Sequence, residues 1–187
     1  WLRLNIARLD GRVTGVISDI TEEILKRRQI ERERDYDLLT DLPNRRAFNA
    51  ALGKIFQDTG ALGVAALVML DLDNLKFIND SHGHDCGDAY IRSTADALRR
   101  YAPAHALIAR MSGDEFYVLF SGYTSREAAQ VDICRLKEGL RQSTFPLPDE
   151  TRLNIRASAG VAWYPEHSTS YEKLLKYADF AMYQVKN

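Results

Sequence analysis

Two pairs of acidic residues stand where apolar segments end. Asp71 and Asp73 directly follow a continuous apolar run, and Asp114 and Glu115 stand beside a Ser-Gly pair between two further apolar runs. Burying an unpaired carboxylate is expensive, so these acids are expected to line a site and not to belong to the core. If the two segments lie side by side, the acids converge and need a compensating cation. Clustered carboxylate oxygens suit Mg²⁺, which typically takes one or two carboxylates together with substrate phosphates.

A phosphate-binding segment is predicted directly after the first acidic pair. The stretch from Asn74 to Asp80 is typical of a short helix. The first backbone N–H groups of such a helix, around Asn74 and Leu75, would face a phosphate. Lys76 adds a positive charge at the same place. A lone lysine is usually an ordinary surface residue, but this placement favours phosphate binding.

The elements that must position these residues follow from hydrophobic patterning. Residues 64–70 form a continuous apolar run, which indicates a strand buried on both faces. Two β-prone runs around Ser112-Gly113 indicate a hairpin, with Gly113 allowing close backbone approach to a ligand. Amphipathic helices and a further strand are predicted elsewhere, at 45–56, 88–101, 124–142 and 171–186 for the helices and 154–163 for the strand. This order predicts an α/β (α+β) sandwich with a mainly antiparallel central sheet flanked by helices.

Ordered sequence blocks carry a resemblance to a known family. The blocks are Asp41–Phe48 (DLPNRRAF), Asp71–Asp80 (DLDNLKFIND), Gly83–Asp88 (GHDCGD), Ser112–Phe116 (SGDEF) and Ala178–Tyr183 (ADFAMY). Their order and spacing resemble the GGDEF domain, the catalytic module of diguanylate cyclases, from about Asp37 to Asn187. The resemblance implies the palm-like fold shared with nucleotidyl cyclases. The departure is Ser112, which stands where the family motif has its first glycine.

The resemblance also implies a metal site and a reaction. Mg²⁺ (or Mn²⁺) would be held by Asp71, the backbone carbonyl of Leu72, Asp114 and Glu115. Asp114 and Glu115 would be the catalytic acids, with Glu115 either helping to bind a second metal or activating the attacking hydroxyl. Two GTP molecules, one on each subunit of a homodimer, would be joined into cyclic di-GMP with release of pyrophosphate.

Substrate-binding roles follow from the same resemblance. Asn79 and Asp88 would read guanine, since a carboxylate accepts from its N1–H and N2–H₂ groups and an amide can serve O6 or N3. Lys186 would contact the phosphates. Ser112 and Gly113 would lie beside the nucleotide, where the serine hydroxyl either fits or crowds the base and ribose. The sequence places Asp88 at the start of a long helix, after a loop over 83–87.

An inhibitory product site is not expected. Many family members carry Arg-x-x-Asp ending five residues before the signature. The matching positions here are Pro103, Ala104, His105 and Ala106, so neither the arginine nor the aspartate is present.

Composition bounds the class of protein. Hydrophobic content of 45% with 27% charged residues is that of an ordinary globular protein, and a net charge of −1 gives no basic field for nucleic acid. Cys86 and Cys134 lack zinc or CxxC spacing, so reduced thiols in a cytoplasmic protein are expected. We also expect a piece of a longer protein, which could be membrane-anchored and could carry sensory and phosphodiesterase domains.

The segments before the main domain are predicted to belong to a signalling arrangement. Residues 1–19 alternate in hydrophobicity around an Asp10-Gly11 turn and resemble the C-terminal strands of a truncated PAS sensory domain. Residues 20–36 are predicted to be a helical linker, with a charged helix from Thr21 to about Asp35 that is either solvated or a signalling coiled coil. The GGDEF-like domain spans 37–187.

Three other functions stay open at this point. A GTP-binding regulatory module without turnover is suggested by Ser112 and opposed by the intact acids. A purely structural dimerisation domain would not need convergent carboxylates. Another nucleotidyl cyclase or polymerase palm would share the metal acids but would not require Asn79 and Asp88.

Overall fold

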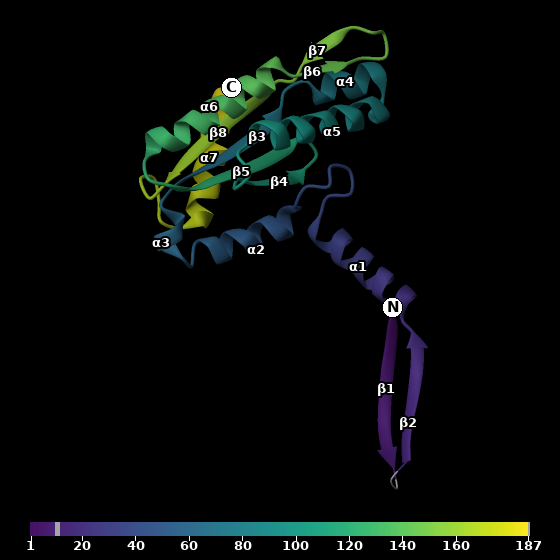
Figure 1. Ribbon diagram of the computed structural model, residues 1–187. Helices are drawn as coiled ribbons and strands as arrows, with labels where there is room; N and C mark the ends of the chain where they lie inside the picture. Colours follow the sequence, from purple (N-terminus) through teal and green to yellow (C-terminus); the bar gives the residue numbers. More distant parts are fainter. Residues whose placement is uncertain (10–11, 187) are drawn as a thin grey trace.

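The computed structural model describes residues 1–9 and 12–186. The predicted Asp10-Gly11 turn and the final residue, Asn187, therefore lie outside the described residues. A central sheet with helices on both faces makes up the main body, from which an N-terminal helix and hairpin project (Figure 1). The predicted α/β sandwich is confirmed.

The sheet has four strands in the order β4-β5-β3-β8, and each neighbouring pair is antiparallel. The strands are β3 (Val64–Leu72), β4 (Leu107–Ser112), β5 (Glu115–Tyr123) and β8 (Ala157–Tyr164). All but the first residue of β3 are buried, because this strand has a neighbour on each side and helices on both faces. The continuous apolar run thus corresponds to a central strand buried on both faces, as the sequence predicts.

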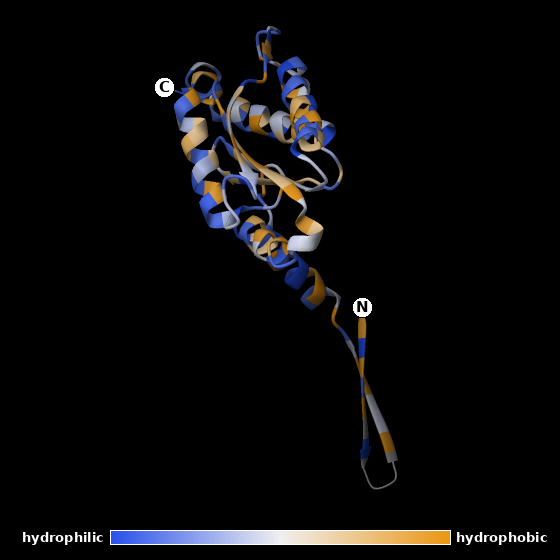
Figure 2. Cartoon of the chain, turned by 90° about the vertical axis from the view of Figure 1, so that its left-hand side faces the viewer, coloured by the Kyte–Doolittle hydropathy of each residue, from blue (hydrophilic) through white to orange (hydrophobic). Residues whose placement is uncertain are grey.

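Side chains of β3 alternate between two cores, as the period of a strand requires. Ala66, Val68 and Leu70 pack in the core beneath α4 (Leu75–His82), α5 (His84–Tyr101) and α6 (Arg126–Gln142). The residues between them pack in the core beneath α2 (Arg45–Ile55), α3 (Thr59–Leu62) and α7 (Tyr171–Lys186). Figure 2 shows the hydrophobic central strand lying between helices that carry both hydrophilic and hydrophobic residues. Such packing fixes where each strand ends, and therefore where the acids stand.

Local capping explains the bounds of the outer helices. The Asn44 side chain accepts from the backbone N–H of Ala47 (3.1 Å) and starts α2, and Ser125 accepts from that of Ala128 (3.2 Å) and starts α6. A small hairpin, β6 (Thr144–Pro146) with β7 (Arg152–Asn154), follows α6.

The N-terminal segment consists of β1 (Leu2–Leu9), β2 (Arg12–Asp19) and α1 (Thr21–Asp35). The predicted hairpin is present as an antiparallel pair, and the predicted helix has the expected bounds. Several large apolar side chains of the hairpin are exposed, among them Leu2 at 72%. The PAS origin of this hairpin stays a prediction. Within the described residues, no helix combines the length and apolar character that crossing a membrane requires.

Candidate active site

The acidic residues lie at one end of the central sheet, where β3 ends and β5 begins. The register of β3 places Asp71 opposite Glu115 on β5 and opposite Ser158 on β8. The backbone N–H of Leu72 donates to the carbonyl of Asp114 (3.2 Å), which ties the end of β3 to the β4–β5 turn. The sequence could suggest this convergence only if the two segments were neighbours, and the antiparallel β3–β5 pairing makes them so.

An ammonium group occupies the position of a counter-ion at these acids. Lys186, from the end of α7, donates to Oδ1 of Asp71, whose side chain is only 11% exposed. That hydrogen bond, together with the charges of Asp71, Asp114 and Asp73, raises the pKa of Lys186 despite partial burial. Asp73 itself accepts from the hydroxyl of Ser158 (2.7 Å). The negative charges of Asp71, Asp73 and Asp114 therefore all act on the ammonium group of Lys186.

The other signature acid has partners of its own. Oε2 of Glu115 accepts from the hydroxyl of Ser112 (2.7 Å) and lies 3.7 Å from an Nη2 of Arg45. Arg45 comes from the first turn of α2. The structure places its guanidinium beside the signature glutamate, which sequence patterning did not show.

The donor chemistry suits a divalent cation, but the acids are not assembled around one. Within the described residues, no group of three or more His, Cys, Asp or Glu side chains is arranged to hold a metal ion. Asp71 is paired with Lys186 and Glu115 with Arg45, so side-chain cations already balance these charges. The hard carboxylate oxygens suit Mg²⁺. The ammonium of Lys186 now occupies the place of a cation beside Asp71, and a metal ion would displace it.

The two residues predicted to read guanine lie on neighbouring helices. Asn79 is half-buried on α4, and Asp88 is exposed on α5. A Cβ atom at Gly87 would lie 1.9 Å from Oδ1 of Asn79, so the amide fills the space that a side chain at position 87 would take. This close approach brings the Asn79 amide next to the helical turn that carries Asp88.

The start of α5 corrects the sequence prediction. The helix begins at His84, so Asp88 lies inside the helix and not at its N-terminus. Gly83, with φ of +83°, separates α4 from α5 and makes the only interruption between them. The sequence suggested a loop over 83–87 because Gly87 resembles a helix breaker, whereas its role is to admit the Asn79 side chain.

The predicted phosphate-binding helix is present and begins at Leu75. Asn74 precedes it but makes no side-chain capping hydrogen bond, which leaves the first backbone N–H groups to other acceptors. Lys76 is exposed in the first turn. These features stand directly after the acidic end of β3.

An arginine behind the signature turn links it to the start of the domain. Nε and Nη2 of Arg110 donate to the carbonyl of Gly113 (3.1 and 2.9 Å). Its Nη1 contacts both carboxylate oxygens of Asp37 (2.9 and 3.1 Å). Burial raises the pKa of Asp37, but hydrogen bonds from Thr40 and Arg110 more than offset this, so the net pKa lies below its ordinary value. No local signal in the sequence predicts this pair, since the partners are far apart in the chain.

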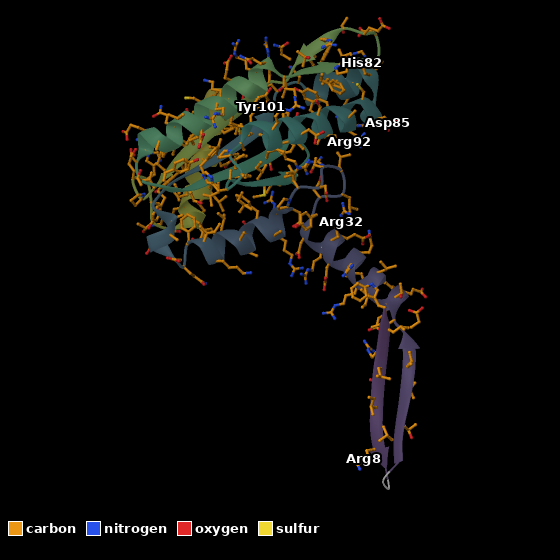
Figure 3. The ribbon with its side chains drawn as sticks, in the orientation of Figure 1. Arg8, Arg32, His82, Asp85, Arg92 and Tyr101 are labelled. Atoms are coloured by element: carbon orange, nitrogen blue, oxygen red, sulfur yellow. The ribbon has the colours of Figure 1, made fainter. Side chains whose placement is uncertain are left out.

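The junction with α1 adds a further ion pair. Arg32, labelled in Figure 3, lies near the end of α1 and contacts Asp41 of the following loop at 2.9 Å. Asn44 of the same loop donates to the carbonyl of Arg34 (2.8 Å), and the carbonyl of Pro43 accepts from the backbone N–H of Arg110 (3.0 Å). The end of α1 thus contacts the loop that supports the signature hairpin.

The positions that match the inhibitory product site hold an internal contact. His105 lies 3.1 Å from the hydroxyl of Tyr123, which in turn donates to Asp132 (2.7 Å). Burial and the hydrogen bond to Asp132 raise the pKa of Tyr123. The expectation that cyclic di-GMP does not bind there stays a prediction.

Comparison with known proteins identifies the same family as the sequence blocks. The family described as "Diguanylate cyclase, GGDEF domain" matches residues 34–187. "Probable diguanylate cyclase DgcC" of Escherichia coli (strain K12) is 33% identical over 189 residues, which cover 100% of this chain and 50% of that protein. "Cyclic di-GMP phosphodiesterase NbdA" of Pseudomonas aeruginosa is 35% identical over 179 residues, 95% of this chain and 22% of that protein.

A solved structure has the same fold. The GGDEF domain of PA1120 (TpbB or YfiN) from Pseudomonas aeruginosa superposes with a TM-score of 0.74 at 33% identity, covering 81% of this chain and 88% of that one. The chain spans no more than half the length of the curated relatives named above.

Proposed function

Since this chain belongs to the diguanylate cyclase GGDEF domain family, we propose that it joins two GTP molecules into cyclic di-GMP. In each half of the reaction, the 3′-hydroxyl oxygen of one GTP bonds to the α-phosphorus of the other. The bond to the leaving pyrophosphate breaks, and the hydroxyl proton is released. The observation that carries the proposal is that Asp71 lies opposite Glu115 at one end of the sheet, while Lys186 bonds Asp71 and lies in the field of Asp114.

Asp71, the backbone carbonyl of Leu72, Asp114 and Glu115 would hold Mg²⁺ or Mn²⁺. The cation, when bound, supplies positive charge that stabilises the transferring phosphoryl group and lowers the pKa of the attacking hydroxyl. Lys186 balances Asp71 before substrate arrives and is freed to pair with the triphosphate. The chain thereby exchanges one ion pair for another without exposing an unbalanced carboxylate.

Guanine recognition is assigned to Asn79 and Asp88. The exposed Asp88 carboxylate accepts from N1–H and N2–H₂, and the Asn79 amide beside it serves O6 or N3. The uncapped start of α4, with Asn74, Leu75 and Lys76, binds the phosphates. Gly113 lets the signature turn approach the nucleotide, because glycine has no side chain and readily adopts the φ of +38° found there.

Turnover requires a homodimer. One active site holds one GTP, and the attacking hydroxyl belongs to a GTP on the partner subunit. The same proposal places the domain in the cytoplasm and gives it a PAS-derived input through α1. It also includes a phosphodiesterase domain elsewhere in the full protein. DNA and RNA are not proposed as ligands, since the net charge is −1.

A regulatory GTP-binding module is the second candidate. A relative named as a phosphodiesterase, of which this chain covers 22%, and the serine at position 112 favour it. Such a module would bind GTP through the same residues without joining two molecules.

Incubation of the protein with GTP and Mg²⁺, followed by chromatographic separation of nucleotides, tests the proposal. Cyclic di-GMP and pyrophosphate are the expected products, and Asp114→Asn is the matched inactive control. GTP binding by calorimetry without product would support the regulatory module instead.

A further inference from the structure

The first signature residue makes a contact that a glycine cannot make. Ser112 and Glu115 are paired across the β4–β5 turn, so their side chains share one face of the hairpin. The serine hydroxyl donates to Oε2 of Glu115 at 2.7 Å. The departure from the family motif therefore adds a hydrogen bond to an acidic residue of the proposed site.

Ser112 and Arg45 both approach Oε2 of the Glu115 carboxylate. Arg45 approaches Oε2 from α2 at 3.7 Å, and Ser112 binds Oε2 from β4. The Glu115 side chain is 31% exposed, so one end of the carboxylate is restrained while the group still faces solvent. Within residues 1–9 and 12–186, Ser112 donates to Oε2 and no hydrogen bond reaches Oε1, which leaves Oε1 for another ligand.

We propose that Ser112 is a positioning residue whose hydroxyl orients Glu115 with Oε1 presented to a divalent cation. The inference rests on the proposed function for the identity of that cation site. A glutamate already held in one rotamer loses less conformational entropy when it binds a metal than a mobile one does. The hydroxyl thus increases cation affinity without itself contacting the cation.

The hydroxyl can restrain Glu115 in the cation-free protein by no more than the net worth of one hydrogen bond, which sets the upper size of the effect. We expect loss of the hydroxyl to weaken cation binding about fivefold, which is ~1 kcal/mol when tenfold corresponds to 1.4 kcal/mol. The proposal concerns the hydroxyl and not the bulk of the side chain. Alanine and threonine therefore separate it from crowding of the nucleotide.

Binding of Mn²⁺ alone to the purified protein, measured from the electron paramagnetic resonance of free Mn²⁺, tests the proposal directly. Ser112→Ala should bind Mn²⁺ about fivefold more weakly, and Ser112→Thr should stay within about twofold of wild type. In a Glu115→Gln background, Ser112→Ala should have no further effect. Equal affinity of Ser112→Ala and wild type, or no Mn²⁺ binding by wild type, would overturn the proposal.

Turnover gives a second readout that separates this proposal from the proposed function. With GTP as substrate, Ser112→Ala should need about fivefold more Mg²⁺ for half-maximal rate, with an unchanged KM for GTP at saturating Mg²⁺. A raised KM with an unchanged Mg²⁺ requirement would show that the hydroxyl contacts the nucleotide, and would overturn the positioning role. If wild type makes no cyclic di-GMP, the proposed function fails while the Mn²⁺ comparison still decides the role of Ser112.

Discussion

The ion pair between Asp37 and Arg110 should stabilise the domain and its signature turn, and Asp37→Asn removes its negative charge. Arg110 is 11% exposed and Asp37 is 25% exposed, so the pair lies between a surface and a buried one. Surface pairs contribute about 0–1 kcal/mol, and breaking a buried pair costs about 3–5 kcal/mol. We therefore expect Asp37→Asn to lower the free energy of unfolding by about 2 kcal/mol.

A second substitution separates the charge from the hydrogen bonds. Thr40 is buried and donates both its hydroxyl (2.7 Å) and its backbone N–H (2.9 Å) to Oδ1 of Asp37. Asparagine keeps an oxygen acceptor for Thr40, whereas Asp37→Ala leaves the buried O–H donor of Thr40 without its acceptor, which costs about 1 kcal/mol more. The expected order of stability is wild type, then Asp37→Asn, then Asp37→Ala.

Urea unfolding at 25 °C and pH 7, followed by circular dichroism, measures these differences. Glu31→Gln is the matched control, because it neutralises one acid of an exposed pair with Arg27 and should change stability by less than about 0.5 kcal/mol. A loss below about 0.5 kcal/mol in Asp37→Asn would refute the reasoning, since the pair would then behave as a surface pair.

The pH dependence of stability gives an independent check. The pKa of Asp37 is lower in the folded state than the ordinary value of about 3.9. Its contribution is therefore fully present above about pH 4 and is lost as the pH falls through the folded-state pKa. The stability difference between wild type and Asp37→Asn should shrink below about pH 4.

Three further predictions concern the site. Asp71→Asn and Asp114→Asn should each abolish formation of cyclic di-GMP without unfolding the domain, because each removes a negative ligand from a divalent site; full activity with an unchanged melting curve would contradict this. Asp88→Ala should weaken GTP binding in calorimetry about tenfold by leaving guanine donors unpaired, and an unchanged affinity would remove Asp88 from the guanine site. Cyclic di-GMP should not bind through residues 103–106 when a non-hydrolysable GTP analogue blocks the active site; saturable binding that is lost in His105→Ala would show otherwise.

The order of the main elements and most of their bounds could be predicted from the sequence, because burial gives each of them a periodic pattern of apolar residues, whereas α3 and the hairpin of β6 and β7 were not predicted. The run 64–70 is apolar throughout since β3 is covered on both faces. The charged segment from Thr21 to Asp35 is a helix with the predicted bounds, because it contains no glycine or proline and needs no partner to define it. The signature blocks likewise identify the acids before their positions are known.

The start of α5 required the tertiary structure. Gly87 is a poor helix former by itself, and only the Asn79 side chain packed against it explains why the helix passes through that position. The prediction of a loop over 83–87 rested on the residues of that segment alone, so it could not take into account Asn79 on the neighbouring helix α4.

The pairing of charges was also decided by tertiary structure alone. Arg110 reaches Asp37 across 73 positions of sequence, and Arg45 reaches Glu115 from a helix that precedes the sheet. Hydrophobic periodicity fixes which face of an element is buried, but it carries no information on where a polar side chain of one element meets another. Those meetings depend on how helices and strands pack, and here they determine that Lys186, Arg45 and Ser112 hold the acids of the site.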